Sequence, residues 1–269
     1  MSRERGSIAI VALWGVALIA VLLAAASAAT RSEVFVAGNA LGSARARLAA
    51  EAGTQLGLAR LLRGERDPQT WQDGGTAVRI AIVDEAGKID INLAPLDLLT
   101  GLFTAAGKPH DVAERLACNV LDRRGDMAPP CPQPDTRRTY RFAAIEELAG
   151  VPGIDAPLYE RVADCVTVAT GASAIDPSVA PRMVLLALPG ATEGLVDSYL
   201  DSRGFWGGQA LPALPFLMAS PRRDFTIEAV AITADRARYR ADLQIRLTET
   251  PSRPYQVMGW RNSSRIPPS

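Results

Sequence analysis

The sequence predicts an α+β fold in which a long N-terminal helix lies on an antiparallel sheet and a large α-helical domain is inserted between the strands. Residues 7–63 read as one helix, because first an uncharged apolar run and then a run of helix formers follow each other without a proline. Strand patterns follow this helix and return at the end of the chain, with helical patterns between them. An insertion explains this order, since the first strands can then pair with the last.

The N-terminal part of the helix is apolar and long enough to cross a bilayer. Residues 1–6 are polar, and the run from Ser7 to Ala29 carries no charge. At about 1.5 Å per residue this run spans roughly 34 Å, against roughly 30 Å of hydrocarbon. We therefore expect a transmembrane helix at residues 7–30. Residues 1–6, a short basic stretch that ends in glycine directly before this helix, resemble the leader of type IV pilins and pseudopilins. The alternative is a secretory signal peptide cut within residues 24–29, although its apolar core is usually only about 7–15 residues long.

The second part of the helix, residues 31–63, is expected to dock on a soluble domain. Its apolar residues recur about every 3.6 positions, so one face can pack on a globular core. A simple membrane anchor would more often end in a flexible linker.

Composition limits the chemistry that the chain can perform. Its 269 residues include 29 basic and 29 acidic side chains, so no global charge attracts nucleic acid or anionic lipid. His110 is the only histidine, which excludes a multi-histidine zinc site, and its loop setting is typical of a solvated side chain. The sequence has no nucleophile elbow, phosphate-binding loop or dinucleotide fingerprint in a fitting context. We expect no enzymatic activity and assign no catalytic residue.

Three cysteines leave one unpaired if the soluble part lies in an oxidising compartment. Cys118 and Cys131 enclose a proline-rich loop that a disulfide would tie down. Cys165 lies in an apolar helical pattern and has the setting of a core residue. We prefer the Cys118–Cys131 pair, while the sequence leaves the connectivity open.

The middle of the chain changes from strands to helices. Residues 77–83 alternate as a strand does, and residues 88–92 read as a returning strand or an extended edge. We assign residues 64–91 to the first part of the α/β domain and residues 92–220 to the inserted helical domain. Three segments of the insertion share a loose helical-hairpin plan with Pro-Gly turns, namely residues 92–99, 142–154 and 176–190.

Helical hairpins of this kind also occur in DNA-binding proteins, where backbone amides at the glycine turn contact phosphate. The main alternative function is therefore a membrane-anchored periplasmic nucleic-acid-binding protein of the helix-hairpin-helix type. Charge opposes it, because residues 89–204 hold 10 Lys and Arg against 16 Asp and Glu. Asp155 and Glu193 also lie at turns where a binder would need Lys or Arg. We interpret the hairpins as scaffold and expect no nucleic-acid partner.

Residues 221–269 return to strand patterns. Three alternating runs, residues 225–233, 238–247 and 255–261, are candidates for consecutive antiparallel strands. We expect them to complete the sheet that residues 64–91 begin.

Five stretches together resemble a known family. They are the Gly6–Ser7 junction with its apolar helix, residues 83–92, residues 120–126, the turn at 145–153 and residues 175–190. Over nearly the whole chain they resemble the minor pseudopilin K family of the type II secretion system, also called general secretion pathway protein K. The resemblance implies a pilin-like fold with an inserted helical domain. It also implies that the prepilin peptidase cuts after Gly6 and methylates the new N-terminus at Ser7.

Two positions depart from the general pilin pattern. Ser7 stands where pilins have an aromatic residue or Met, and Val11 stands where they have Glu. The K-type subunit characteristically lacks this glutamate. In the filament core the glutamate offsets the N-terminal charge of a neighbouring subunit, which is expensive to leave unpaired in lipid. A subunit at the tip has no subunit ahead of it, so Val11 costs nothing there.

The resemblance implies a mechanical function at the inner membrane. The protein would be a single-pass inner-membrane protein whose C-terminal domain lies in the periplasm. With the I-type and J-type minor pseudopilins it would cap a filament of the major pseudopilin, which pushes folded proteins through an outer-membrane secretin. Members of this family can bind calcium, and Asp122 and Asp126 are weak candidates for its ligands here, since paired surface carboxylates are usually just solvated.

Overall fold

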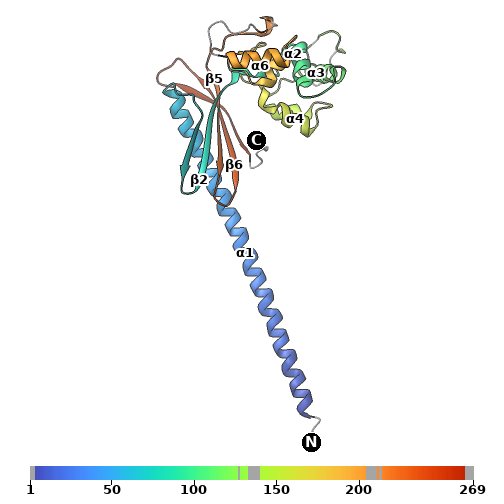
Figure 1. The fold of residues 1–269 in the computed structure, drawn as a ribbon, viewed down its shortest axis with the longest axis vertical. Helices are drawn as coiled ribbons and strands as arrows, with labels where there is room; N and C mark the ends of the chain where they lie inside the picture. Colours follow the sequence, from blue (N-terminus) through green and yellow to red (C-terminus); the bar gives the residue numbers. More distant parts are fainter. Residues whose placement is uncertain (1–3, 127, 133–139, 204–210, 212–213, 264–269) are drawn as a thin grey trace.

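One helix of 59 residues, α1 (Glu4–Leu62), dominates the shape of the molecule (Figure 1). The first half of α1 projects from the body, and its second half lies along a sheet. This is the continuous helix that we expected for residues 31–63. The computed structural model describes the chain apart from residues 1–3, 127, 133–139, 204–210, 212–213 and 264–269. Within α1 the side chains of residues 4–12 and 24–36 are also outside the described part.

The projecting half of α1 presents apolar side chains to its surroundings. Among the described side chains of this half, Leu13 is 73% and Trp14 is 72% exposed. A search of the described residues finds no helix with a stretch long and apolar enough to cross a membrane. The expected transmembrane segment, residues 7–30, extends beyond residues 13–23 into side chains outside the described part, and it stays a prediction.

Five antiparallel strands form the main sheet, in the order β1-β2-β5-β6-β7. Their bounds are β1 Gln69–Asp73, β2 Thr76–Asp84, β5 Asp224–Ile232, β6 Arg238–Leu247 and β7 Tyr255–Ser263. β2 and β5 are neighbours, with Ala77 opposite Ile232 at one end and Asp84 opposite Phe225 at the other. The first strands therefore pair with the last, as expected, and the helical insertion leaves and re-enters the sheet between β2 and β5.

The second half of α1 covers one face of this sheet, over β2, β5 and β6. Small residues allow the close approach. A Cβ atom on Gly53 would lie 2.8 Å from Cγ1 of Val78 and 2.9 Å from Cβ of Ala229, which is closer than van der Waals contact. Apolar side chains of both layers form one core, whose fully buried members include Ile80, Phe225, Ile227 and Ile245.

Residues 85–220 form a second body, which we call the helical block. Its elements are η1 (Glu85–Gly87), β3 (Ile89–Asp90), α2 (Leu96–Ala105), α3 (His110–Arg124), η3 (Ile145–Gly150), α4 (Ala156–Val162), η4 (Ala163–Cys165), β4 (Val166–Thr167), α5 (Arg182–Leu186), α6 (Glu193–Ser202) and η5 (Leu214–Phe216). Local sequence determines where some of these helices begin and end. The Asp155 carboxylate accepts a hydrogen bond from the Leu158 amide and caps the start of α4. Gly125, with φ +79°, ends α3. A separate apolar core fills this block.

Residues 88–92 do not return along β2. β3 pairs instead in parallel with β4 inside the helical block, with Ile89 opposite Val166. The extended conformation is as expected, but the interpretation as a returning strand is wrong. Both edges of β2 are already paired, one with β1 and the other with β5, so residues 88–92 have no free edge of β2 to pair with.

Candidate functional site

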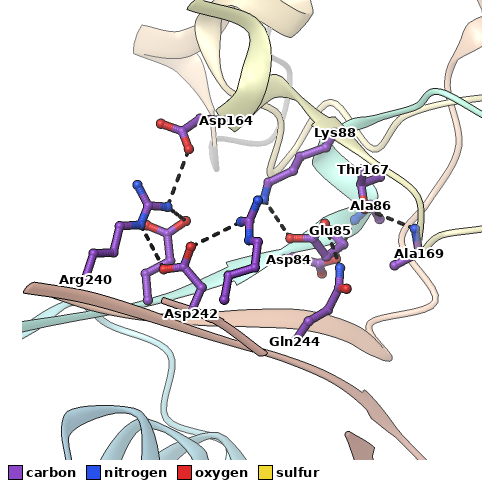
Figure 2. A network of polar contacts seen from close by, with 12 residues as sticks. Asp84, Glu85, Ala86, Lys88, Asp164, Thr167, Ala169, Arg240, Asp242 and Gln244 are labelled. Atoms are coloured by element: carbon purple, nitrogen blue, oxygen red, sulfur yellow. Dashed lines mark hydrogen bonds and ion pairs between the residues drawn. The ribbon is translucent and has the colours of Figure 1, made fainter. Parts of the chain in front are cut away.

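The helical block meets the sheet on the face opposite α1, along a polar contact zone that we call the seam. Successive side chains of a strand point to opposite faces of the sheet. In β5 and β6 every second side chain packs under α1, and the side chains between them point to the block. The seam joins Glu85, Lys88, Glu146 and Asp164 of the block to Glu228, Arg240, Asp242, Gln244 and Arg261 of the sheet. Figure 2 shows the central part of this network. A cavity of about 170 Å³ lies within the seam, lined by residues of both bodies.

A buried ion pair lies within the seam. Lys88 Nζ lies 2.7 Å from Oε1 of Glu85, and both side chains are almost fully buried (Figure 2). Burial acts to raise the pKa of Glu85, but the charge of Lys88 and hydrogen bonds from Lys88, Thr167 and Thr226 outweigh burial and lower it. Thr167 belongs to β4 and Thr226 to β5, so this one carboxylate binds groups of the block and of the sheet.

Arg240, on β6, contacts carboxylates of both the sheet and the helical block. Its guanidinium lies 2.8 Å from Asp242, 3.0 Å from Glu228 and 3.4 Å from Asp164 of η4. Burial opposes the positive charge, but the three carboxylates outweigh it and raise the pKa of Arg240. Burial also raises the pKa of Glu228, with Arg240 acting in the opposite direction. Arg240 therefore carries its charge at any physiological pH and connects the two bodies.

Arg261, on the edge strand β7, also links the sheet to the helical block. One guanidinium nitrogen lies 3.1 Å from Asp242 and another lies 3.5 Å from Glu146 of η3. At the opposite end of β6, Arg246 donates a hydrogen bond of 2.6 Å to the carbonyl oxygen of Ala169 in the block. The seam thus holds the block on the sheet through charged side chains and a few hydrogen bonds. This arrangement binds and orients two bodies.

The structure offers no calcium site around the two candidate carboxylates within its described residues. Asp126 forms an ion pair of 2.8 Å with Nε of Arg124, which a cation would have to displace. Asp122 lies on α3, and its carbonyl oxygen accepts a hydrogen bond from the Gly125 amide. No group of three or more His, Cys, Asp or Glu side chains within the described part of the chain could hold a metal ion. Within the described residues, Asp122 and Asp126 are thus not part of a group that could hold a metal ion.

The other residues singled out from the sequence lie away from the seam. Gly6, Ser7 and Val11 are in the N-terminal turns of α1, where the side chains are outside the described part. Cys118 of α3 and Cys131 form a disulfide, the pair that the sequence favoured. Cys165 is buried, and burial raises the pKa of its thiol to about 11. His110 is the exposed first residue of α3.

Sequence reasoning missed the seam. One signal for it exists: Arg238, Arg240, Asp242, Gln244 and Arg246 give β6 a continuous polar face. Polar residues at every second position of a strand predict a face that contacts solvent. They do not indicate that the helical block covers this face.

No family model matches this sequence, and no curated relative matches it. The fold is similar to a chain of the crystal structure of the GspK-GspI-GspJ complex from the type 2 secretion system of enterotoxigenic Escherichia coli, with a TM-score of 0.55. The two share 16% sequence identity, and the match covers 87% of this chain and 99% of the other. An identity this low shows the fold alone. The chain therefore has a pseudopilin-like α+β fold, with a long N-terminal helix packed on a five-stranded antiparallel sheet.

Proposed function

We propose that this protein is the K-type minor pseudopilin of a type II secretion system and that it caps the pseudopilus. The order of its elements carries the proposal: a long helix, two strands, a large helical block and three strands. The match extends over 99% of the other chain, so it includes more than the α1 helix that pilin-like proteins share. The sequence features around Gly6, Val11 and residues 175–190 favour the K-type member.

The N-terminal half of α1 serves as the membrane anchor in this proposal. The uncharged run from Ser7 to Ala29 would lie in the inner membrane before assembly, with the sheet and the helical block in the periplasm. The prepilin peptidase would cut after Gly6. An oxidising periplasm agrees with the Cys118–Cys131 disulfide.

Val11 supports the position at the tip. Body subunits need a carboxylate at this place to neutralise the N-terminal amine of the subunit ahead, and the first subunit has none ahead of it. In Val11→Glu the added carboxylate would therefore lack a partner in the membrane, which costs about 2.5–3.5 kcal/mol at the bilayer centre when the carboxylate is ionised. We expect Val11→Glu to leave incorporation along the filament body unchanged.

The seam fits a mechanical role rather than a catalytic one. Glu85 contacts Gln244 of the sheet and Arg240 contacts Asp164 of the block, while Asp242 pairs with Arg240 and Arg261 within the sheet. These charges orient the two bodies. The proposed partners are the I-type and J-type minor pseudopilins, the major pseudopilin filament and the prepilin peptidase.

N-terminal processing tests this proposal. The full chain is co-expressed with a prepilin peptidase, and the membrane-extracted product is analysed by intact mass and N-terminal sequencing. We expect a mature chain that begins at Ser7, and we expect Gly6→Leu to remain uncut, because the peptidase needs an unhindered backbone there. Gly15→Ala, a change at another glycine of α1, is the matched control and should be cut normally. A mature chain that begins near Arg31 would instead identify an ordinary secreted protein.

A further inference from the structure

The two bodies of the molecule have separate apolar cores. The core under α1 uses residues of α1, β2, β5 and β6, whereas the core of the helical block uses residues from Ile89 to Leu211. Among the described residues these two buried clusters share no member. Among the described residues, ion pairs and hydrogen bonds connect the two bodies, together with the polar and apolar side chains that line the cavity of the seam. An interface of this kind between domains permits relative motion, because its polar groups can bind water when it opens.

The chain crosses between the two bodies at one end of the sheet only. It leaves β2 at Asp84 and returns to β5 at Asp224, and Asp84 lies opposite Phe225 in the sheet. Short contacts fix this end. The Ser220 hydroxyl donates to Asp84 at 2.8 Å, and Arg246 donates to the Ala169 carbonyl at 2.6 Å. We call these two adjacent crossings the hinge.

The contacts far from the hinge are longer and more exposed. Two pairs, Arg240–Asp164 at 3.4 Å and Arg261–Glu146 at 3.5 Å, connect the block to β6 and β7. Arg240 lies about 20 Å along β6 from Arg246 at the usual strand rise of about 3.4 Å per residue. The side chains of Asp164 and Glu146 are 67% and 52% exposed, so salt screens both pairs. We call these two pairs the latch.

We infer that the helical block is a movable body that swings on the hinge and is held closed by the latch. Opening would uncover the outer face of β5, β6 and β7. This face carries Glu228 and also Arg240, Asp242 and Gln244, which are labelled in Figure 2. This inference uses the contacts of the seam and does not depend on the proposed function.

Lysine chemistry offers a direct test, because the chain has only two lysines, Lys88 and Lys108. Lys88 is 6% exposed and lines the cavity of the seam, so only opening gives a reagent access to its amine. Lys108 lies in the turn between α2 and α3 and serves as an internal reference. The full chain in detergent is treated with an acetylating reagent, and mass spectrometry gives the labelling rate of each lysine.

The latch variant is Asp164→Asn with Glu146→Gln. We expect this variant to raise the acetylation rate of Lys88, relative to that of Lys108, by roughly two- to tenfold. The expected change is small because each exposed ion pair contributes little to the stability of the closed arrangement. The matched control, Asp197→Asn with Glu51→Gln, removes two exposed ion pairs elsewhere and should leave the ratio unchanged. In the unmodified protein, raising NaCl from about 0.1 to 1 M shortens the Debye length from about 10 to 3 Å and should also raise the ratio.

Circular dichroism recorded in parallel separates opening from unfolding. A Lys88 rate that rises while the spectrum stays native supports the inference. If the latch variant does not fold, the salt series on the unmodified chain decides alone. Equal Lys88 rates in the latch and control variants and at both salt concentrations would overturn the inference. A rate that rises only as the spectrum is lost would overturn it too.

Discussion

The hydroxyl of Ser220 donates a hydrogen bond of 2.8 Å to the carboxylate of Asp84, 136 residues earlier in the chain. These two residues mark where the helical insertion begins and ends. Burial raises the pKa of Asp84, the charge of Asp176 raises it further, and the hydrogen bonds from the Ala86 amide and Ser220 act against both. The bond therefore stabilises an ionised carboxylate that is only partly solvated, at the one place where both crossings meet.

Ser220→Ala should lower the free energy of unfolding by about 1–2 kcal/mol, because the Asp84 carboxylate loses a donor that water replaces incompletely. Chemical denaturation measures this. Ser198→Ala removes an exposed hydroxyl that bonds within α6 and should change stability little. Equal effects of the two substitutions would mean that the contact at the hinge does not stabilise the fold.

Gly53→Ala should destabilise the protein by about 1–3 kcal/mol, although alanine is the better helix former. The new methyl group would meet Val78 and Ala229 within 3 Å, so α1 must shift off the sheet. Gly38→Ala, where the added Cβ has nothing within 4 Å, should instead be neutral or stabilising. Thermal denaturation of both variants measures the contrast, and a stabilising Gly53→Ala would show that α1 does not pack so closely.

Replacing both Cys118 and Cys131 by Ser should lower stability by about 3 kcal/mol, since their disulfide closes a short loop with a sequence separation of 13. Denaturant titration of oxidised protein, reduced protein and the double variant measures this. Reduced protein and the double variant should behave alike. Buried Cys165, whose thiol pKa is raised to about 11, should stay unalkylated in the native chain at about pH 8. An oxidised protein no more stable than the double variant would contradict this prediction.

Glu228→Gln should change how stability depends on pH. Burial raises the pKa of Glu228, so its carboxyl binds a proton more tightly in the folded chain than in the unfolded one. The stability that Glu228 contributes is therefore present below its unfolded pKa and is lost as the pH rises through the folded value. The unmodified protein should thus lose stability between about pH 4 and 7, and Glu228→Gln should not lose this part. The free energy of unfolding of the variant should therefore increase relative to that of the unmodified protein as the pH rises.

Thermal denaturation across this pH range gives the difference. If Glu228→Gln instead becomes less stable relative to the unmodified protein as the pH rises, the attraction of Arg240 for the Glu228 carboxylate must lower its pKa by more than burial raises it.

Much of the fold could be predicted because its signals are local. The length of α1 and the strands β5, β6 and β7 follow from periodicity within each segment. β1 was missed because Gln69–Asp73 has a single apolar residue, Trp71, and therefore no alternation. The partner of β3 could not be predicted, since β3 pairs with β4, which lies almost 80 positions further along the chain.

The candidate site was harder to predict than the fold. Arg240 and Arg261 show as charged residues on strands, a pattern that usually means a solvated face. Their partners Asp164 and Glu146 lie in short helices of the insertion, and nothing in the local sequence links the two sets. Such a seam arises only from the packing of two separately folded bodies.

The most direct test of the central claim is assembly with the other minor pseudopilins. The full chain is co-expressed with the I-type and J-type subunits of the same secretion system and purified through a tag on the J-type subunit, and the mass of the product is measured by light scattering. Our account predicts a ternary complex that contains one copy of each chain. A stable complex of the I-type and J-type subunits that excludes this protein, while the protein itself is folded, would contradict the account.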